Sequence, residues 1–140
     1  MNYEVTKSFE FDAAHRLVDY DGKCARIHGH RYKVLITLSS SKLDDSGFVC
    51  DFNELKNVVG EWIDENWDHK IILSVNDPLG QILSNSEFRT SIYYVPFNPT
   101  AENMAVFLFS SFRDVLNKGV VYLKSVTVFE TPTCWATFHD

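Results

Sequence analysis

Apolar and polar residues alternate in two stretches near the start of the chain. From Tyr3 to Phe11 every second residue is mostly apolar, and the residues between them are polar. The same period of two runs from His30 to Ser39, where Tyr32, Val34 and Ile36 share one face. This period is typical of a strand with one buried face. The pattern therefore predicts strands at residues 3–11 and 30–39.

The end of the chain shows a similar pattern. Residues 120–129 and 134–138 read as two strands, and Glu130 to Thr133, which includes Pro132, reads as the turn that joins them. Proline and threonine between two apolar runs favour a turn. We predict a hairpin here.

The middle of the chain has helical spacing. Asp51 followed by Glu54 is typical of a helix start, and apolar residues recur at helical intervals from Leu55 to Ile63. Thr100 is expected to cap a second helix that ends near residues 117–119, where a lysine and a glycine follow an asparagine. Residues 74–98 are less regular, with a turn expected at 76–80 and a short strand possible at 91–95.

The predicted order is strand, strand, helix, helix, strand, strand. Hairpins at both ends with helices between them favour an α+β fold. We expect a four-stranded antiparallel sheet with two helices packed on one face.

Composition limits the possible functions. The chain has 140 residues, of which 45% are hydrophobic, and this fits one domain over residues 1–140. Its net charge of −6 argues against nucleic acid or an anionic membrane as a partner. Three scattered cysteines do not indicate a disulfide framework, and the N-terminus does not resemble a signal peptide. We expect a cytoplasmic protein.

Histidines carry the strongest chemical signal. His28 and His30 are two apart, so on an extended segment both point to the same side. A third histidine from a neighbouring segment, such as His15, can complete a site of three imidazoles. Three protein ligands leave a coordination position open, as in catalytic zinc sites, and zinc is the simplest choice. The alternative is that each histidine is simply exposed or packed.

Cys24 lies close to these histidines in the sequence. Its neighbours Lys23 and Arg26 are basic, and basic surroundings favour a reactive thiol. Asp68 and His69 could join it in a relay that moves protons, if the fold brings them together. The alternatives are a buried structural cysteine and a histidine that interacts with the end of a helix.

Two glutamates allow a binding role or a structural one. Glu130 follows an apolar strand and could cap the hairpin turn, or it could accept paired hydrogen bonds from an amidine-like edge. Glu102 lies in the first turn of the second predicted helix, where a carboxylate compensates the helix dipole.

Together these segments resemble the 6-pyruvoyltetrahydropterin synthase and 6-carboxytetrahydropterin synthase family. The matching pieces run in family order along nearly the whole chain: Phe11-Asp12-Ala13-Ala14-His15, Cys24-Ala25-Arg26-Ile27-His28-Gly29-His30, Asp51-Phe52, Asp68-His69-Lys70, Pro99-Thr100-Ala101-Glu102-Asn103 and Val128-Phe129-Glu130-Thr131.

The resemblance implies a tunnelling fold that oligomerises into a barrel. It implies a homohexamer built as a dimer of trimers, with active sites between subunits. It also implies a role for each matching residue: His15, His28 and His30 bind Zn²⁺; Cys24, Asp68 and His69 are catalytic; Glu130 anchors the pterin ring; Thr100 and Glu102 line the pterin end of the pocket.

The resemblance further implies a pterin triphosphate substrate. The short gap between Cys24 and His28 looks like the carboxytetrahydropterin branch, which cuts 7,8-dihydroneopterin triphosphate with loss of triphosphate and acetaldehyde on the path to queuosine. One alternative is the pyruvoyl branch, which eliminates triphosphate in a tetrahydrobiopterin-type pathway. Another is a metal-binding assembly module without catalysis.

Overall fold

The fold is α+β, as predicted, but the sheet is larger than predicted. The structure is a computed structural model that describes residues 2–140. Its sheet has six strands in the order β4-β3-β1-β2-β5-β6. The expectation of four antiparallel strands is therefore wrong, because two short strands add to the edge next to β1.

Four strands correspond to the predicted hairpins. They are β1 (Tyr3–His15), β2 (His28–Ser40), β5 (Val121–Thr131) and β6 (Cys134–His139). They pair antiparallel in the order β1-β2-β5-β6. Glu130 belongs to β5, so it lies in a strand and not in the turn.

The two additional strands are β3 (Ile71–Ser74) and β4 (Ile92–Val95). β3 pairs parallel to the end of β1, and β4 pairs parallel to β3. β4 confirms the short strand expected at residues 91–95. β3 was not predicted, because four residues are too few to show a clear alternation of apolar and polar residues. The sheet is therefore mixed.

The first predicted helix is continuous from α1 (Phe52–Leu55) through a π-helical turn, η2 (Lys56–Gly60), into α2 (Glu61–Asn66). The Asp51 side chain accepts a hydrogen bond from the Asn53 N–H, as predicted for a cap. The second predicted helix is α4 (Ala101–Leu116), and the Thr100 side chain caps it by accepting from the Asn103 N–H.

A third helix was missed. It is α3 (Pro78–Ser84), in the irregular stretch where only a turn was predicted, and a short 3-10 helix, η3 (Glu87–Ser91), follows it. Asp77 caps α3 by accepting from the Leu79 N–H. Asp followed by Pro is typical of a helix start as well as of a turn, and here it begins a helix.

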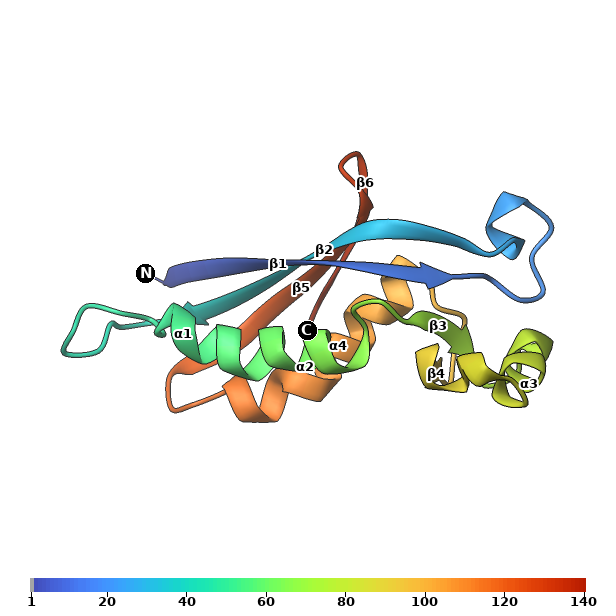
Figure 1. The fold of residues 1–140 in the computed structure, drawn as a ribbon. Helices are drawn as coiled ribbons and strands as arrows, with labels where there is room; N and C mark the ends of the chain where they lie inside the picture. Colours follow the sequence, from blue (N-terminus) through green and yellow to red (C-terminus); the bar gives the residue numbers. More distant parts are fainter. Residues whose placement is uncertain (1) are drawn as a thin grey trace.

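The helices α1–α2 and α4 lie on one face of the long strands, as Figure 1 shows. The main core forms between them and includes Tyr32, Val34, Ile36 and Leu38 of β2, which are fully buried. β3, β4 and α3 lie beyond the α1–α2 helix, at the end of β1 that carries His15 (Figure 1). This end of the sheet holds the candidate site.

Among residues 2–140, none of the helices combines the length and apolar character needed to cross a membrane.

Candidate metal centre and active site

Three histidines meet at one end of the sheet. β1 and β2 are longer than predicted, so His15 and His28 lie on strands and pair directly across the β1–β2 ladder. His30 is two residues along β2, where its side chain points to the same side as that of His28. One ligand atom from each of the three histidines lies within 4.8 Å of the others.

Backbone carbonyls fix the orientation of two of the rings. The Nδ1 atom of His15 lies 2.7 Å from the Pro99 carbonyl oxygen, and Nδ1 of His28 lies 2.7 Å from that of Arg26. A carbonyl oxygen only accepts, so each Nδ1 carries the proton and donates. In neutral rings, each Nε2 then presents a lone pair, which is the form that ligates a metal.

These two Nε2 atoms lie 3.0 Å apart. Two lone pairs at this distance repel unless a cation lies between or beside them. A tetrahedral zinc with bonds of about 2.1 Å separates its nitrogen ligands by roughly 3.4 Å, so little movement is needed. The third ring adds a further observation, because His30 Nε2 is buried and has no hydrogen-bond partner among residues 2–140.

Burial favours the neutral, ligating form of His15 and His30. It lowers the pKa of His15 from 6.5 to about 4, although the bond to Pro99 opposes the shift. Burial also lowers the pKa of His30, against the charge of Glu130, which raises it. Protons therefore compete weakly with a metal for these nitrogens near neutral pH. The geometry and the donor set both fit a metal ion held by His15, His28 and His30.

Glu130 and Cys24 lie on the histidine side of the sheet. The Tyr32 ring packs edge-on against His15 and His30, with centroids 5.8 Å and 5.3 Å away. Burial raises the pKa of Tyr32, and the charges of Glu130 and of ionised Cys24 raise it further, so both groups are near this ring. Cys24 itself is half-buried in the 3-10 turn η1 (Lys23–Ala25).

Asp68 and His69 form a pair in the loop before β3. His69 Nδ1 lies 3.0 Å from Asp68 Oδ2, and the backbone N–H of Asp12 donates to Asp68 Oδ1. Partial burial raises the pKa of Asp68, but the bonds from Asp12 and His69 outweigh it and lower the pKa overall. His69 adopts a left-handed backbone with φ of 59°, and its side chain is 77% exposed.

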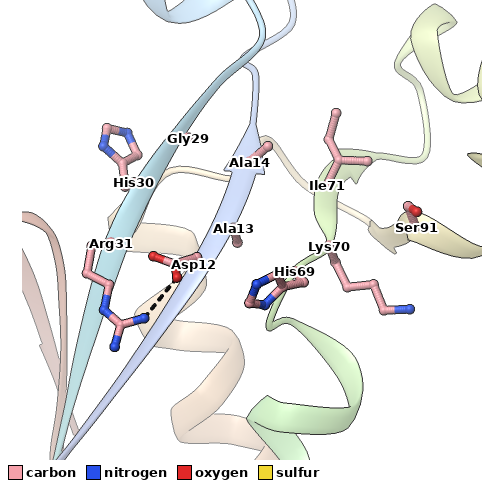
Figure 2. A pocket seen from close by; sticks show the side chains of 10 residues that line it. All are labelled: Asp12, Ala13, Ala14, Gly29, His30, Arg31, His69, Lys70, Ile71 and Ser91. Carbon is pink, nitrogen blue, oxygen red and sulfur yellow. Dashed lines mark hydrogen bonds and ion pairs between the residues drawn. The ribbon is translucent and has the colours of Figure 1, made fainter.

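The hollow beside this pair has a volume of about 540 Å³. Figure 2 shows His69 and Lys70 across β1 from the β2 residues His30 and Arg31, with Arg31 paired to Asp12. Cys24 is not among the lining residues in the described part of the chain. The fold of one chain thus gathers the three histidines, and no hydrogen bond between Cys24 and His69 is found among residues 2–140.

Thr100 and Glu102 begin α4. Thr100 follows Pro99, whose carbonyl accepts a hydrogen bond from His15, so the cap and the candidate metal centre share one loop. Glu102 is exposed in the first turn of the helix.

Sequence reasoning missed the groups that support the site. These are the Pro99 and Arg26 carbonyls, the ion pair of Arg16 with Asp77, and Asn98, whose side chain bonds both backbone groups of Val18. The carbonyls leave no signal in a sequence. Arg16 directly after His15, and Asp77 before Pro78, were the available signals for the ion pair.

An α+β fold that gathers three histidines at one end of its sheet defines a protein with a candidate metal site. Residues 4–140 match the family model described as 6-pyruvoyl tetrahydropterin synthase. The chain belongs to this family of pterin synthases.

Relatives with pterin synthase names align with most of the chain. It is 39% identical over 132 residues to the 6-carboxy-5,6,7,8-tetrahydropterin synthase of Rickettsia conorii, covering 93% of this chain and 95% of the relative. The protein of that name from Haemophilus influenzae is 33% identical, with 99% of each chain covered. In solved structures, the 6-pyruvoyl tetrahydropterin synthase of Caenorhabditis elegans superposes with a TM-score of 0.71 at 26% identity, covering 100% and 96% of the two chains.

Proposed function

We propose that this protein is a zinc-dependent 6-carboxy-5,6,7,8-tetrahydropterin synthase. It would convert 7,8-dihydroneopterin triphosphate with loss of triphosphate and acetaldehyde, in queuosine biosynthesis. One observation carries the proposal: two imidazole lone pairs face each other at 3.0 Å beside a third buried imidazole nitrogen. The names of relatives at 33% and 39% identity support the choice of reaction.

His15, His28 and His30 would hold the zinc. A zinc ion bound by three histidines keeps an open position, where it acidifies a hydroxyl and polarises a carbonyl oxygen. The bonds from Nδ1 to the Pro99 and Arg26 carbonyls keep two of the rings in the ligating orientation. Such bonds to the non-ligating nitrogen also strengthen a histidine as a ligand.

Cys24 would remove a side-chain proton of the substrate as a thiolate. His69 would return a proton, and Asp68 would orient the His69 ring through the Nδ1 contact at 3.0 Å. The half-buried thiol of Cys24 and the exposed ring of His69 are both accessible enough to reach a substrate.

Glu130 would anchor the pterin ring. Its carboxylate accepts two parallel hydrogen bonds from the N–H groups on one edge of the ring, which fixes the reacting carbons beside the metal. Its charge acts on His30, which supports this position. Thr100 and Glu102, at the start of α4, would line the pterin end of the pocket.

We further propose that residues 1–140 form one tunnelling-fold domain and assemble as a cytoplasmic homohexamer, a dimer of trimers. The sites would then lie between subunits, with Cys24 of one chain facing His69 of another. The separation of these two residues within one chain supports this arrangement, since the hollow beside His69 does not include Cys24.

The alternative function is a 6-pyruvoyltetrahydropterin synthase, which eliminates triphosphate but keeps the carbon chain. The description of the family model and the name of the Caenorhabditis elegans structure favour this reading. The carboxytetrahydropterin synthase is preferred because several relatives at 37–40% identity carry that name.

The experiment is a turnover assay with 7,8-dihydroneopterin triphosphate, in which mass spectrometry identifies the pterin product. Zinc-loaded protein should yield the carboxypterin, and a chelator should abolish the reaction. Cys24→Ala should retain zinc but lose turnover. A pyruvoyl pterin as the main product would select the alternative, and no consumption of substrate by zinc-loaded protein would reject both enzymes.

A further inference from the structure

The segment that carries Cys24 has little apolar anchoring. It runs from residue 16 to residue 27, between β1 and β2, and its 3-10 turn η1 contains no buried residue. A segment without a buried apolar side chain opens easily unless polar contacts hold it. The position of the Cys24 thiol therefore depends on hydrogen bonds.

Arg16 provides two of these contacts with one guanidinium group. Its Nε donates to Asp77 Oδ2 at 2.7 Å, and its Nη1 donates to the Ala25 carbonyl oxygen at 3.0 Å. Ala25 is the residue directly after Cys24. Because the guanidinium is planar and rigid, it fixes the direction of both bonds at once.

Asp77 is itself fixed in place by burial and by hydrogen bonds. Its side chain is fully buried, and its Oδ1 accepts from the Leu79 N–H at the start of α3. Its backbone N–H bonds to Ser74, the last residue of β3. A buried carboxylate needs a cation, and Arg16 provides it. A chain of contacts therefore runs from the last residue of β3 to Asp77, from Asp77 to Arg16, and from Arg16 to the backbone beside Cys24.

Other bonds complete the attachment. The Leu17 N–H donates to the Cys24 carbonyl at 2.8 Å, and the Asn98 side chain bonds both backbone groups of Val18. Arg16 is the only one of these side chains that contacts the segment beside Cys24 itself.

We propose that Arg16 is a positioning residue that holds the Cys24 thiol in its reactive place through Asp77 and the Ala25 carbonyl. The expected effect on turnover rests on the proposed function of Cys24. The expected effect on the position of the thiol does not, because the reactivity of a thiol can be measured without turnover.

The contacts of Arg16 with Asp77 and Ala25 do not include the three histidines. His15 is adjacent to Arg16, but β1 pairing and the bond from its Nδ1 to Pro99 hold it independently. A change at Arg16 should therefore disturb the thiol and leave zinc binding intact.

The test variant is Arg16→Lys. Lysine keeps the charge beside Asp77 but cannot direct two bonds from a rigid plane. Arg113→Lys is the matched control, because Arg113 pairs with Asp140 in a separate ion pair. Asp77→Asn is a second variant, since asparagine also caps helices but lacks the charge.

Two readouts are measured on the zinc-loaded protein. The first is the rate at which iodoacetamide alkylates Cys24, followed by peptide mass spectrometry with the exposed Cys134 as an internal reference. The second is turnover of 7,8-dihydroneopterin triphosphate. For Arg16→Lys we expect the Cys24 rate to change about threefold or more, and kcat to fall about tenfold with KM within about twofold.

We expect Asp77→Asn to change the Cys24 alkylation rate as Arg16→Lys does. In both variants, Cys134 reactivity, zinc content and melting temperature should equal those of Arg113→Lys. An unchanged Cys24 alkylation rate in Arg16→Lys would overturn the proposal. So would a loss of zinc or a lower melting temperature that accompanies the effect, since Arg16 would then act on the metal centre or on the fold. If no protein turns over the substrate, the alkylation readout still decides.

Discussion

The orientation of the His15 and His28 rings decides whether their Nε2 atoms can bind a metal. The Pro99 and Arg26 carbonyls accept hydrogen bonds from the Nδ1–H groups of His15 and His28, so the Nε2 lone pairs face each other at 3.0 Å. A cation bound by both nitrogens would relieve this repulsion. The ring of the third histidine lies beside these two rings.

The first prediction concerns this cluster. His28→Ala should lower the zinc content of the purified protein from about one ion per chain to near zero at limiting free zinc, because two ligands bind zinc far more weakly than three. The measurement is elemental analysis after dialysis. His139→Ala, at the end of β6, is the control and should keep its zinc. Full zinc occupancy in His28→Ala would contradict the site.

The second prediction concerns pH and the metal-free protein. The pKa of His15 is lowered to about 4 in the folded state by burial, whereas an unfolded histidine has a pKa near 6.5. The unfolded chain therefore takes up the proton first as the pH falls. The contribution of neutral His15 to the free energy of unfolding is fully present above pH 6.5. It is lost between pH 6.5 and about 4, by up to about 1.4 kcal/mol per pH unit.

The urea midpoint of chelator-treated protein, measured from pH 7.5 to 5, should record this loss. It should stay level above about pH 6.5 and fall below it, and His30, whose pKa burial also lowers, should add to the fall. A midpoint that does not fall from pH 6.5 to 5 would contradict neutral, buried histidines.

Secondary-structure elements were predictable where the pattern was long and regular. The alternation in β1, β2 and β5 and the helical spacing of α4 gave their positions within a few residues. The continuation of β1 through Asp12 to His15 was missed because Ala13 and Ala14 are both small and break the alternation. That continuation pairs His15 with His28, so its omission hid the geometry of the site.

The remaining elements depend on contacts between distant residues. β3 and β4 are short, and what makes them strands is parallel pairing to β1 and to each other. Sequence alone also could not tell whether Asp68 and His69 line one hollow with Cys24, because no spacing encodes a distance across the sheet. The grouping of His15, His28 and His30, by contrast, could be expected from residue type and from the resemblance to the family, and the structure brings these three side chains together.

The third prediction belongs to the α1–α2 helix. Asp51→Ala removes the bond to the Asn53 N–H at the helix start and should lower the free energy of unfolding by about 1 kcal/mol. Asp51→Asn should recover most of this loss. Urea unfolding measures both. Asp45→Ala, in the turn before the helix, is the matched control because no bond of its carboxylate is found in residues 2–140 and it should change stability little. Equal midpoints for Asp51→Ala and Asp45→Ala would contradict the cap.

For the whole molecule, the main question is where a complete site forms. In one chain, His15 of β1 lies together with His28 and His30 of β2. His69 lies across β1 from His30, in a hollow that Cys24 does not line (Figure 2). The proposed hexamer would bring the two groups together from different chains.

The fourth prediction tests this assembly. Cys24→Ala and His69→Ala proteins should each be inactive alone, and mixing them under conditions that exchange subunits should restore activity. With random mixing, each inter-subunit site has an intact pair in roughly a quarter of cases, so about a quarter of wild-type activity is expected. Mixing a doubly substituted chain with Cys24→Ala is the control and should restore nothing. No recovery in the first mixture, despite proven exchange, would contradict sites between subunits.

The most direct test of the proposed reaction is the molar ratio of acetaldehyde to triphosphate that the zinc-loaded protein releases from 7,8-dihydroneopterin triphosphate. The carboxytetrahydropterin synthase predicts that both accumulate together in a ratio of about one, because each turnover breaks one carbon–carbon bond and expels one triphosphate. Release of triphosphate without acetaldehyde, or of neither, would contradict the proposed reaction.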